Sequence, residues 1–143
     1  SYKCIKEMIE YLVITLKIPH NSNIMDIGSG SSRFLMLALA LFPFFAHADG
    51  VEIVEYRVNM AKIIQNAVCE TLLKSKQVFE NPFTKLTLYH KNIRFYKPEL
   101  PEHNYGIVYM FDRVFNTETF PFIAAFLCSS NTAYLISCRT VLE

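Results

Sequence analysis

Glycine is scarce in this sequence and tryptophan is absent. Average usage of about 7% would place roughly ten glycines in a chain of this length, but only four occur among the 143 residues. None of the four cysteines forms a C-x-x-C pair or lies near a histidine at metal-ligand spacing, so we expect no metal site. Lys and Arg do not cluster, and the longest apolar run, Phe34 to Ala46, is interrupted by Pro43. The sequence therefore gives no strong nucleic-acid-binding patch and no membrane-spanning helix.

The chain does contain enough apolar sequence for a folded core. Hydrophobic residues make up 52% and charged residues 19%, with a formal net charge of +1. These values indicate one domain over residues 1–143. We expect four reduced thiols in an intracellular protein, because buried cysteine behaves as a small hydrophobe. The sequence begins with Ser1 rather than Met, so we expect a fragment or a trimmed version of a longer chain.

The order of apolar segments predicts an α/β fold. Apolar residues recur at helical spacing in some segments and form short continuous runs in others. Continuous apolar strands separated by helices are typical of a mostly parallel sheet that is covered on both faces. Ser31 or Ser32 is expected to cap the second helix. The predicted helices cover 3–17, 31–42, 55–76 and 118–130, and the predicted strands cover 24–27, 50–54, 85–90, 105–111 and 132–138.

Two of the four glycines, Gly28 and Gly30, directly follow the first predicted strand. Ligands of doubly wound sheets bind beyond the carboxyl ends of the strands, and glycine there lets the backbone turn tightly and lets a ligand come close. An ordinary strand-to-helix turn often carries one glycine, so the presence of two glycines favours a ligand-binding loop over an ordinary turn. A P-loop would need a Gly-Lys-Ser/Thr ending, which is absent, and a dinucleotide loop would need a third small residue where the chain has Arg33. The remaining candidate is S-adenosylmethionine, which has no pyrophosphate.

An adenosine ligand is also expected to have its ribose hydroxyls bound by a carboxylate. In doubly wound nucleotide sites this acid lies about 20 residues after the glycine loop, at the end of the second strand. Glu52 lies 24 residues after Gly28, in the segment "DGVEIVEY". Glu55 is the local competitor, but its place at the start of the next helix suits an interaction with the helix N-terminus. We therefore favour Glu52.

Four short motifs together resemble one enzyme family. They are "MDIGSG" at 25–30, "GVEI" at 50–53, "IVYMFDRVF" at 107–115 and "LIS" at 135–137. In this order and spacing they resemble the class I S-adenosylmethionine-dependent methyltransferases. The similarity is sharpest to the non-SET histone lysine methyltransferases named for disruption of telomeric silencing. The resemblance implies a Rossmann-like doubly wound sheet in the order 3-2-1-4-5, with the family's C-terminal two-strand hairpin missing from this chain.

The resemblance implies a role for each matching position around the glycine loop. Asp26 and the segment Gly28, Ser29 and Gly30 would line the methionine and ribose portions of S-adenosylmethionine. Glu52 would hold the ribose hydroxyls. The first half of the cofactor site is thus expected between the ends of the first two strands.

The remaining implied roles lie after the second, third and fourth strands. Ile53 would pack on the adenine, and Asn92 or the neighbouring backbone would accept a hydrogen bond from the adenine amino group. Asp112 would stand near the transferred methyl group and the acceptor, which makes it both a cofactor-binding and the catalytic candidate. The chain departs from the family's paired Asn and following aromatic residue, because it has Phe111, Asp112 and Arg113 there.

The resemblance implies methyl transfer to a protein acceptor, with a histone lysine in a nucleosome as the specific candidate. The protein would then be nuclear, and otherwise cytoplasmic. Two other interpretations stay open. One is a degenerate methyltransferase fold that serves as a binding or scaffold domain, which the departures at Phe111 and Arg113 favour. The other is a methyltransferase that acts on RNA or a small molecule. The sequence leaves the oligomeric state open.

Overall fold

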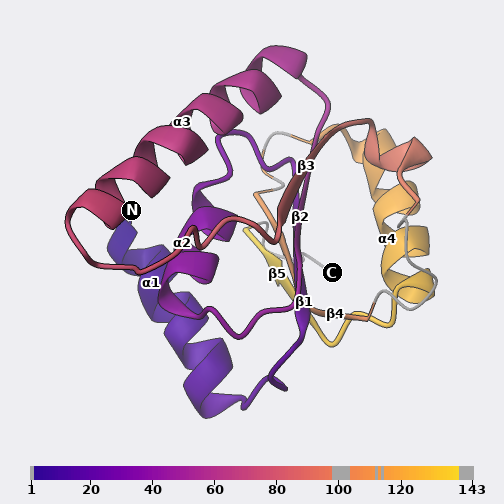
Figure 1. Cartoon of the computed structure of the whole chain (residues 1–143). Helices are drawn as coiled ribbons and strands as arrows, with labels where there is room; N and C mark the ends of the chain where they lie inside the picture. The colour runs from indigo at the N-terminus through magenta and orange to yellow at the C-terminus, as the bar shows by residue number, and fades with distance from the viewer. Residues whose placement is uncertain (1, 98–103, 112, 114, 139–143) are drawn as a thin grey trace.

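The computed structural model describes residues 2–97, 104–111, 113 and 115–138 (Figure 1). Five strands form one sheet in which every neighbouring pair is parallel, in the order β3-β2-β1-β4-β5. This confirms the predicted strand order. The strands are β1 (Asn23–Ile27), β2 (Ala48–Glu52), β3 (Leu86–His90), β4 (Tyr105–Met110) and β5 (Tyr134–Ser137).

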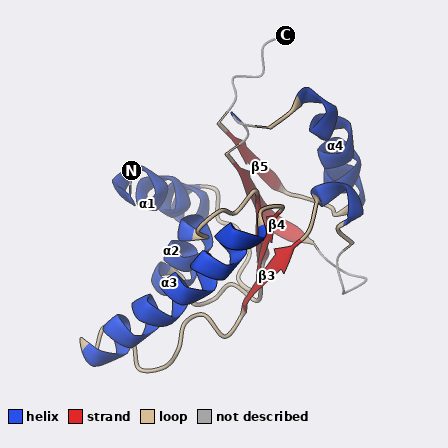
Figure 2. Cartoon of the chain, turned by 90° about the horizontal axis from the view of Figure 1, so that it is seen from above, coloured by secondary structure: helices blue, strands red, loops and turns tan. Residues whose placement is uncertain are grey.

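Helices cover both faces of the sheet. Figure 2 shows α1, α2 and α3 together on one side and α4 on the other. The main helices are α1 (Tyr2–Glu10), α2 (Arg33–Leu41), α3 (Glu55–Lys74) and α4 (Phe120–Ser129), and the short helical turns are η1 (Tyr11–Thr15), η2 (Ile93–Phe95) and η4 (Thr117–Thr119). The predicted covered α/β sheet is therefore confirmed.

The first predicted helix and the second predicted strand differ from the structure in detail. The segment predicted as one helix over 3–17 is α1 followed by the π-helical turn η1, in which Leu16 N–H donates to Tyr11 C=O at 3.2 Å. Apolar spacing does not distinguish a π turn from an α turn. The second strand, predicted over 50–54, is β2 over 48–52. Glu52 is thus the last residue of its strand, and Ile53 lies beyond it.

The core has two layers because successive strand side chains point to opposite faces. Ile24 belongs to the cluster between the sheet and α1, α2 and α3. Met25 and Ile27 belong to the cluster between the sheet and α4. On β2, Val51 points to the α4 side, so Asp26 and Glu52 share the face that carries α2. The carboxyl ends of all five strands meet at one edge, where the site lies.

Within the described ranges, no helix has the length and apolarity needed to cross a bilayer. The structure describes all four cysteines, and no disulfide joins any two of them.

Candidate functional site

The loop that joins β1 to α2 has an unusual backbone. Gly28 and Gly30 have φ values of +75° and +52°, and Ser32 has +57°. Glycine adopts a positive φ easily, whereas a residue with a Cβ adopts it at a cost in conformational energy. The loop is tied to the end of β2, because the N–H groups of Gly28 and Ser29 both donate to Val51 C=O, at 2.7 and 3.1 Å. The glycines are therefore needed for the turn itself.

Ser32 lies at the N-cap of α2, but its side chain does not cap the helix. The left-handed backbone turns its side chain into the protein, where Oγ is buried and has no hydrogen-bond partner among the described residues. The predicted position of the N-cap is therefore confirmed at Ser32, but the side-chain hydrogen bond of a serine cap is absent, and the positive φ of Ser32 was not predicted from the sequence.

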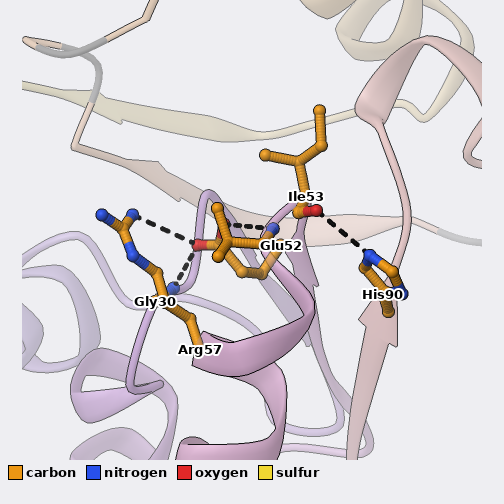
Figure 3. Close-up of polar contacts among 6 residues, drawn as sticks. Gly30, Glu52, Ile53, Arg57 and His90 are labelled. Carbon is orange, nitrogen blue, oxygen red and sulfur yellow. Dashed lines mark hydrogen bonds and ion pairs between the residues drawn. The ribbon is translucent and has the colours of Figure 1, made fainter.

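Glu52 connects the loop to β2 through its carboxylate (Figure 3). Its side chain is 3% exposed. Gly30 N–H donates to Oε2 and Val54 N–H donates to Oε1, both at 2.9 Å. Arg57 Nη1 lies 3.9 Å from Oε2. A carboxylate offers about four lone-pair positions, so both oxygens keep acceptor capacity for two hydroxyl groups of a ligand.

Three side chains occupy the space that a Cβ would fill at two glycine positions. A Cβ on Gly28 would lie 2.7 Å from the ring of Phe115, and a Cβ on Gly50 would lie 2.7 Å from Leu88 Cδ2 and 2.9 Å from Ser29 Oγ. A Cβ on Gly30 would meet nothing closer than 4.0 Å. Gly28 is therefore required both by its backbone angle and by Phe115, and Gly30 by its angle alone.

This difference predicts unequal costs for two similar substitutions. We expect Gly30→Ala to lower the free energy of unfolding by about 1–2 kcal/mol, the cost of a left-handed backbone. Gly28→Ala should cost about 1–3 kcal/mol more, because the new methyl group overpacks against Phe115. Urea unfolding of both variants measures the two costs. Adding Phe115→Leu should recover part of the Gly28→Ala loss and none of the Gly30→Ala loss, and equal costs for both alanines would contradict the packing argument.

Asp26 is a buried carboxyl group beside Glu52. It is 3% exposed, and its Oδ1 has no hydrogen-bond partner among the described residues. Burial, and to a smaller extent the charge of Glu52, raises the pKa of Asp26 from 3.8 to about 8. Asp26 is therefore mostly protonated at neutral pH in the folded chain.

The raised pKa of Asp26 predicts a pH dependence of stability. Between pH 3.8 and about 8 the folded chain keeps a proton on Asp26 that the unfolded chain releases. The free energy of unfolding should therefore fall as pH rises through this window, by at most about 1.4 kcal/mol per pH unit. Asp26→Asn removes this contribution. The free energy of unfolding of the variant, relative to that of the wild type, should therefore increase from pH 5 to pH 8. Urea unfolding at four pH values checks this, and parallel profiles would contradict it.

A cavity of about 190 Å³ lies beside the loop and brings several predicted residues together. Gly28, Ile53 and Asn92 all line it, as does Phe115. Asn92 Oδ1 accepts from Arg94 N–H at 3.0 Å and caps η2. The cavity is smaller than the roughly 300–1,000 Å³ of typical ligand sites. Asp112, the catalytic candidate, lies outside the described residues.

Two contributors to this region were missed by sequence reasoning. Arg57 approaches Glu52, and Phe115 covers Gly28. Arg57 was detectable, since it stands five residues after Glu52 in the first turn of α3. The contact of Phe115 with Gly28 joins residues far apart in the sequence.

No family model and no curated protein matches the chain. Solved structures do match: the methyltransferase domain of bacterial CtHen1-C has a TM-score of 0.68 at 14% identity, over 95% of this chain and 64% of that one. The plantazolicin methyltransferase BpumL in complex with SAH has a TM-score of 0.60 at 14% identity, over 87% of this chain and 40% of that one.

A third match is a SAM-dependent methyltransferase from Aquifex aeolicus, with a TM-score of 0.54 at 17% identity, over 94% of this chain and 70% of that one. At these identities the matches show the fold alone. The chain spans less than two thirds of the length of CtHen1-C and BpumL. The sheet order and these neighbours together show that the chain has the Rossmann-like fold of class I S-adenosylmethionine-dependent methyltransferases.

Proposed function

We propose that the chain binds S-adenosylmethionine at the carboxyl edge of its sheet and acts as a methyltransferase. The observation that carries the proposal is the environment of Glu52. Its buried carboxylate is held at the strand end by Gly30 and Val54 N–H groups and keeps acceptor capacity on both oxygens. A ribose diol is a ligand group that this arrangement suits.

The residues of the edge fit the rest of the cofactor as well. Asp26 Oδ1 is buried without a partner among the described residues. The ammonium group of a methionine moiety beside it would favour the ionised carboxylate, which then accepts a hydrogen bond from that group. Within the loop of Gly28, Ser29 and Gly30, the space beside Gly30 is open to 4.0 Å, which suits close approach of a ligand. Ile53 and Asn92 border the 190 Å³ cavity, which suits the adenine end. Phe115 fills the remaining space against Gly28.

When bound, S-adenosylmethionine supplies an activated methyl group on a sulfonium centre. The chain then needs to orient an acceptor in line with that group more than it needs acid–base residues. Asp112, which follows β4 by two residues in the sequence, is proposed to orient the acceptor.

The cofactor proposal predicts stabilisation by S-adenosylhomocysteine. At a hundredfold excess over its Kd, the ligand should raise the free energy of unfolding by about 2.7 kcal/mol. Glu52→Gln should weaken binding about tenfold or more, because the diol loses a charged acceptor. Glu55→Gln, three residues further on and exposed, is the matched control and should bind like the wild type. Thermal unfolding with increasing ligand measures all three, and no shift at millimolar ligand would reject the proposal.

The proposed acceptor is a protein, with a histone lysine as the specific candidate and a nuclear location as its consequence. The proposal is supported by the resemblance of four motifs, in the glycine loop, β2, β4 and β5, to those of the non-SET histone lysine methyltransferases. RNA and small-molecule acceptors are the alternatives. BpumL, which has this fold, is a plantazolicin methyltransferase and is an example of an enzyme with a different acceptor.

A methylation assay separates these acceptors. We expect the chain to transfer labelled methyl groups to nucleosomes or free histones, and Asp112→Asn to lower the rate by at least tenfold. Because Asp112 is also a cofactor-binding candidate, S-adenosylhomocysteine binding by the variant is measured beside the rate. Total RNA serves as the competing acceptor. Labelling of RNA alone would overturn the protein acceptor and keep the methyltransferase.

A binding domain without catalysis is the second candidate. Two observations favour it: Arg113 Nε donates to Cys138 C=O at 3.3 Å, which ties the end of β4 to the end of β5, and Phe115 fills part of the site. Binding of S-adenosylhomocysteine with no methyl transfer to any of the tested acceptors would support this candidate.

A further inference from the structure

A second and larger cavity lies on the helical face, away from Glu52. Its volume is about 620 Å³, within the range of about 300–1,000 Å³ that is usual for small-molecule sites. Helices α1, α2 and α3 all contribute to it, and they stand on the same side of the sheet (Figure 2). We call it the helix groove, and its residues are Tyr2, Ile5, Arg33, Met36, Leu37, Ala40, Leu41, Ile64, Val68, Leu72, Gln77 and Val78.

The groove exists because α2 is apolar on nearly every side. Its sequence after Arg33 is "FLMLALAL". Phe34 and Leu35 are buried in the core between α2 and the sheet. Leu37 and Leu41 point into the groove and stay partly exposed. A helix with this composition is normally covered on all sides, so the groove is an apolar surface that a further group can cover.

One charged side chain lines the groove. Arg33 stands at the first position of α2, and none of the other lining residues is acidic or basic. Among the described residues, no acidic side chain forms an ion pair with Arg33. The N-terminus of α2 adds partial positive charge at the same end. The groove therefore combines a long apolar floor with a single cationic end.

We propose that the helix groove binds a medium-chain carboxylate, with its head on Arg33 and its alkyl chain along α2. From Arg33 to Leu41 the helix extends for about 12 Å, which suits an alkyl chain of moderate length. Ile64 and Leu72 of α3 form one wall, and Ile5 of α1 contributes to the other. Burial of the alkyl chain supplies affinity, and the guanidinium group selects the charged head.

Calorimetric titration of the whole chain with decanoate, below its micelle concentration, tests the proposal. Decanoate should bind at one site, and decanol, which has the same chain and no charge, should bind about tenfold more weakly. Arg33→Gln should weaken decanoate binding to the level of decanol, and Arg33→Lys should recover part of it. Because Arg33 is exposed, these two variants should fold like the wild type.

A matched pair on α3 locates the site. Ile64 lines the groove, whereas the neighbouring Ile63 is 61% exposed and does not. Ile64→Glu should abolish decanoate binding, and Ile63→Glu should leave it unchanged. Three results would overturn the proposal. The wild type does not bind decanoate, decanol binds as tightly as decanoate, or Ile64→Glu still binds decanoate like the wild type. Self-association that persists in decanoate, measured by sedimentation, would overturn it in favour of a second copy as the occupant.

Discussion

The hydrogen bond between Gly30 N–H and the Glu52 carboxylate is the contact on which the candidate site depends. It joins the middle of the loop after β1 to the last residue of β2, at 2.9 Å. Two further N–H groups of the loop donate to Val51, so the loop lies against β2 through three bonds. The loop can follow this path because Gly28 and Gly30 adopt positive φ. Loop conformation and carboxylate orientation are therefore one structural unit.

The two acids of this unit differ in their surroundings although they share one face of the sheet. Glu52 receives two backbone N–H groups and has Arg57 nearby, and these compensate the burial of its charge. Asp26 has no partner for Oδ1 among the described residues, and burial raises its pKa to about 8. One carboxylate is thus preorganised as an acceptor. The other is a destabilised group whose cost is recovered only when a donor reaches it.

Local signals in the sequence predicted a covered, mostly parallel sheet and the position of Glu52, whereas the strand order came from the family resemblance. Continuous apolar strands and the spacing from the glycine loop needed no tertiary information. The side-chain cap expected at Ser32 is absent because backbone φ at a serine is decided by how the loop meets β2. Phe115 was missed for a related reason, since its contact with Gly28 spans 87 residues of chain. Local sequence patterns therefore predicted the strands and helices, whereas the side chains that fill the site depend on long-range packing, which these patterns do not show.

Helix α2 links the candidate cofactor site to the helix groove. Its first turn follows Ser32 directly, so the loop conformation depends on where α2 begins. Its outer residues, including Leu37 and Leu41, form the floor of the groove. A group that covers this floor stabilises the position of α2 by apolar burial, and it does so without touching Glu52 or Gly30. We therefore expect an occupant of the groove, as proposed above, to stabilise the loop as well, because both depend on the position of one nine-residue helix.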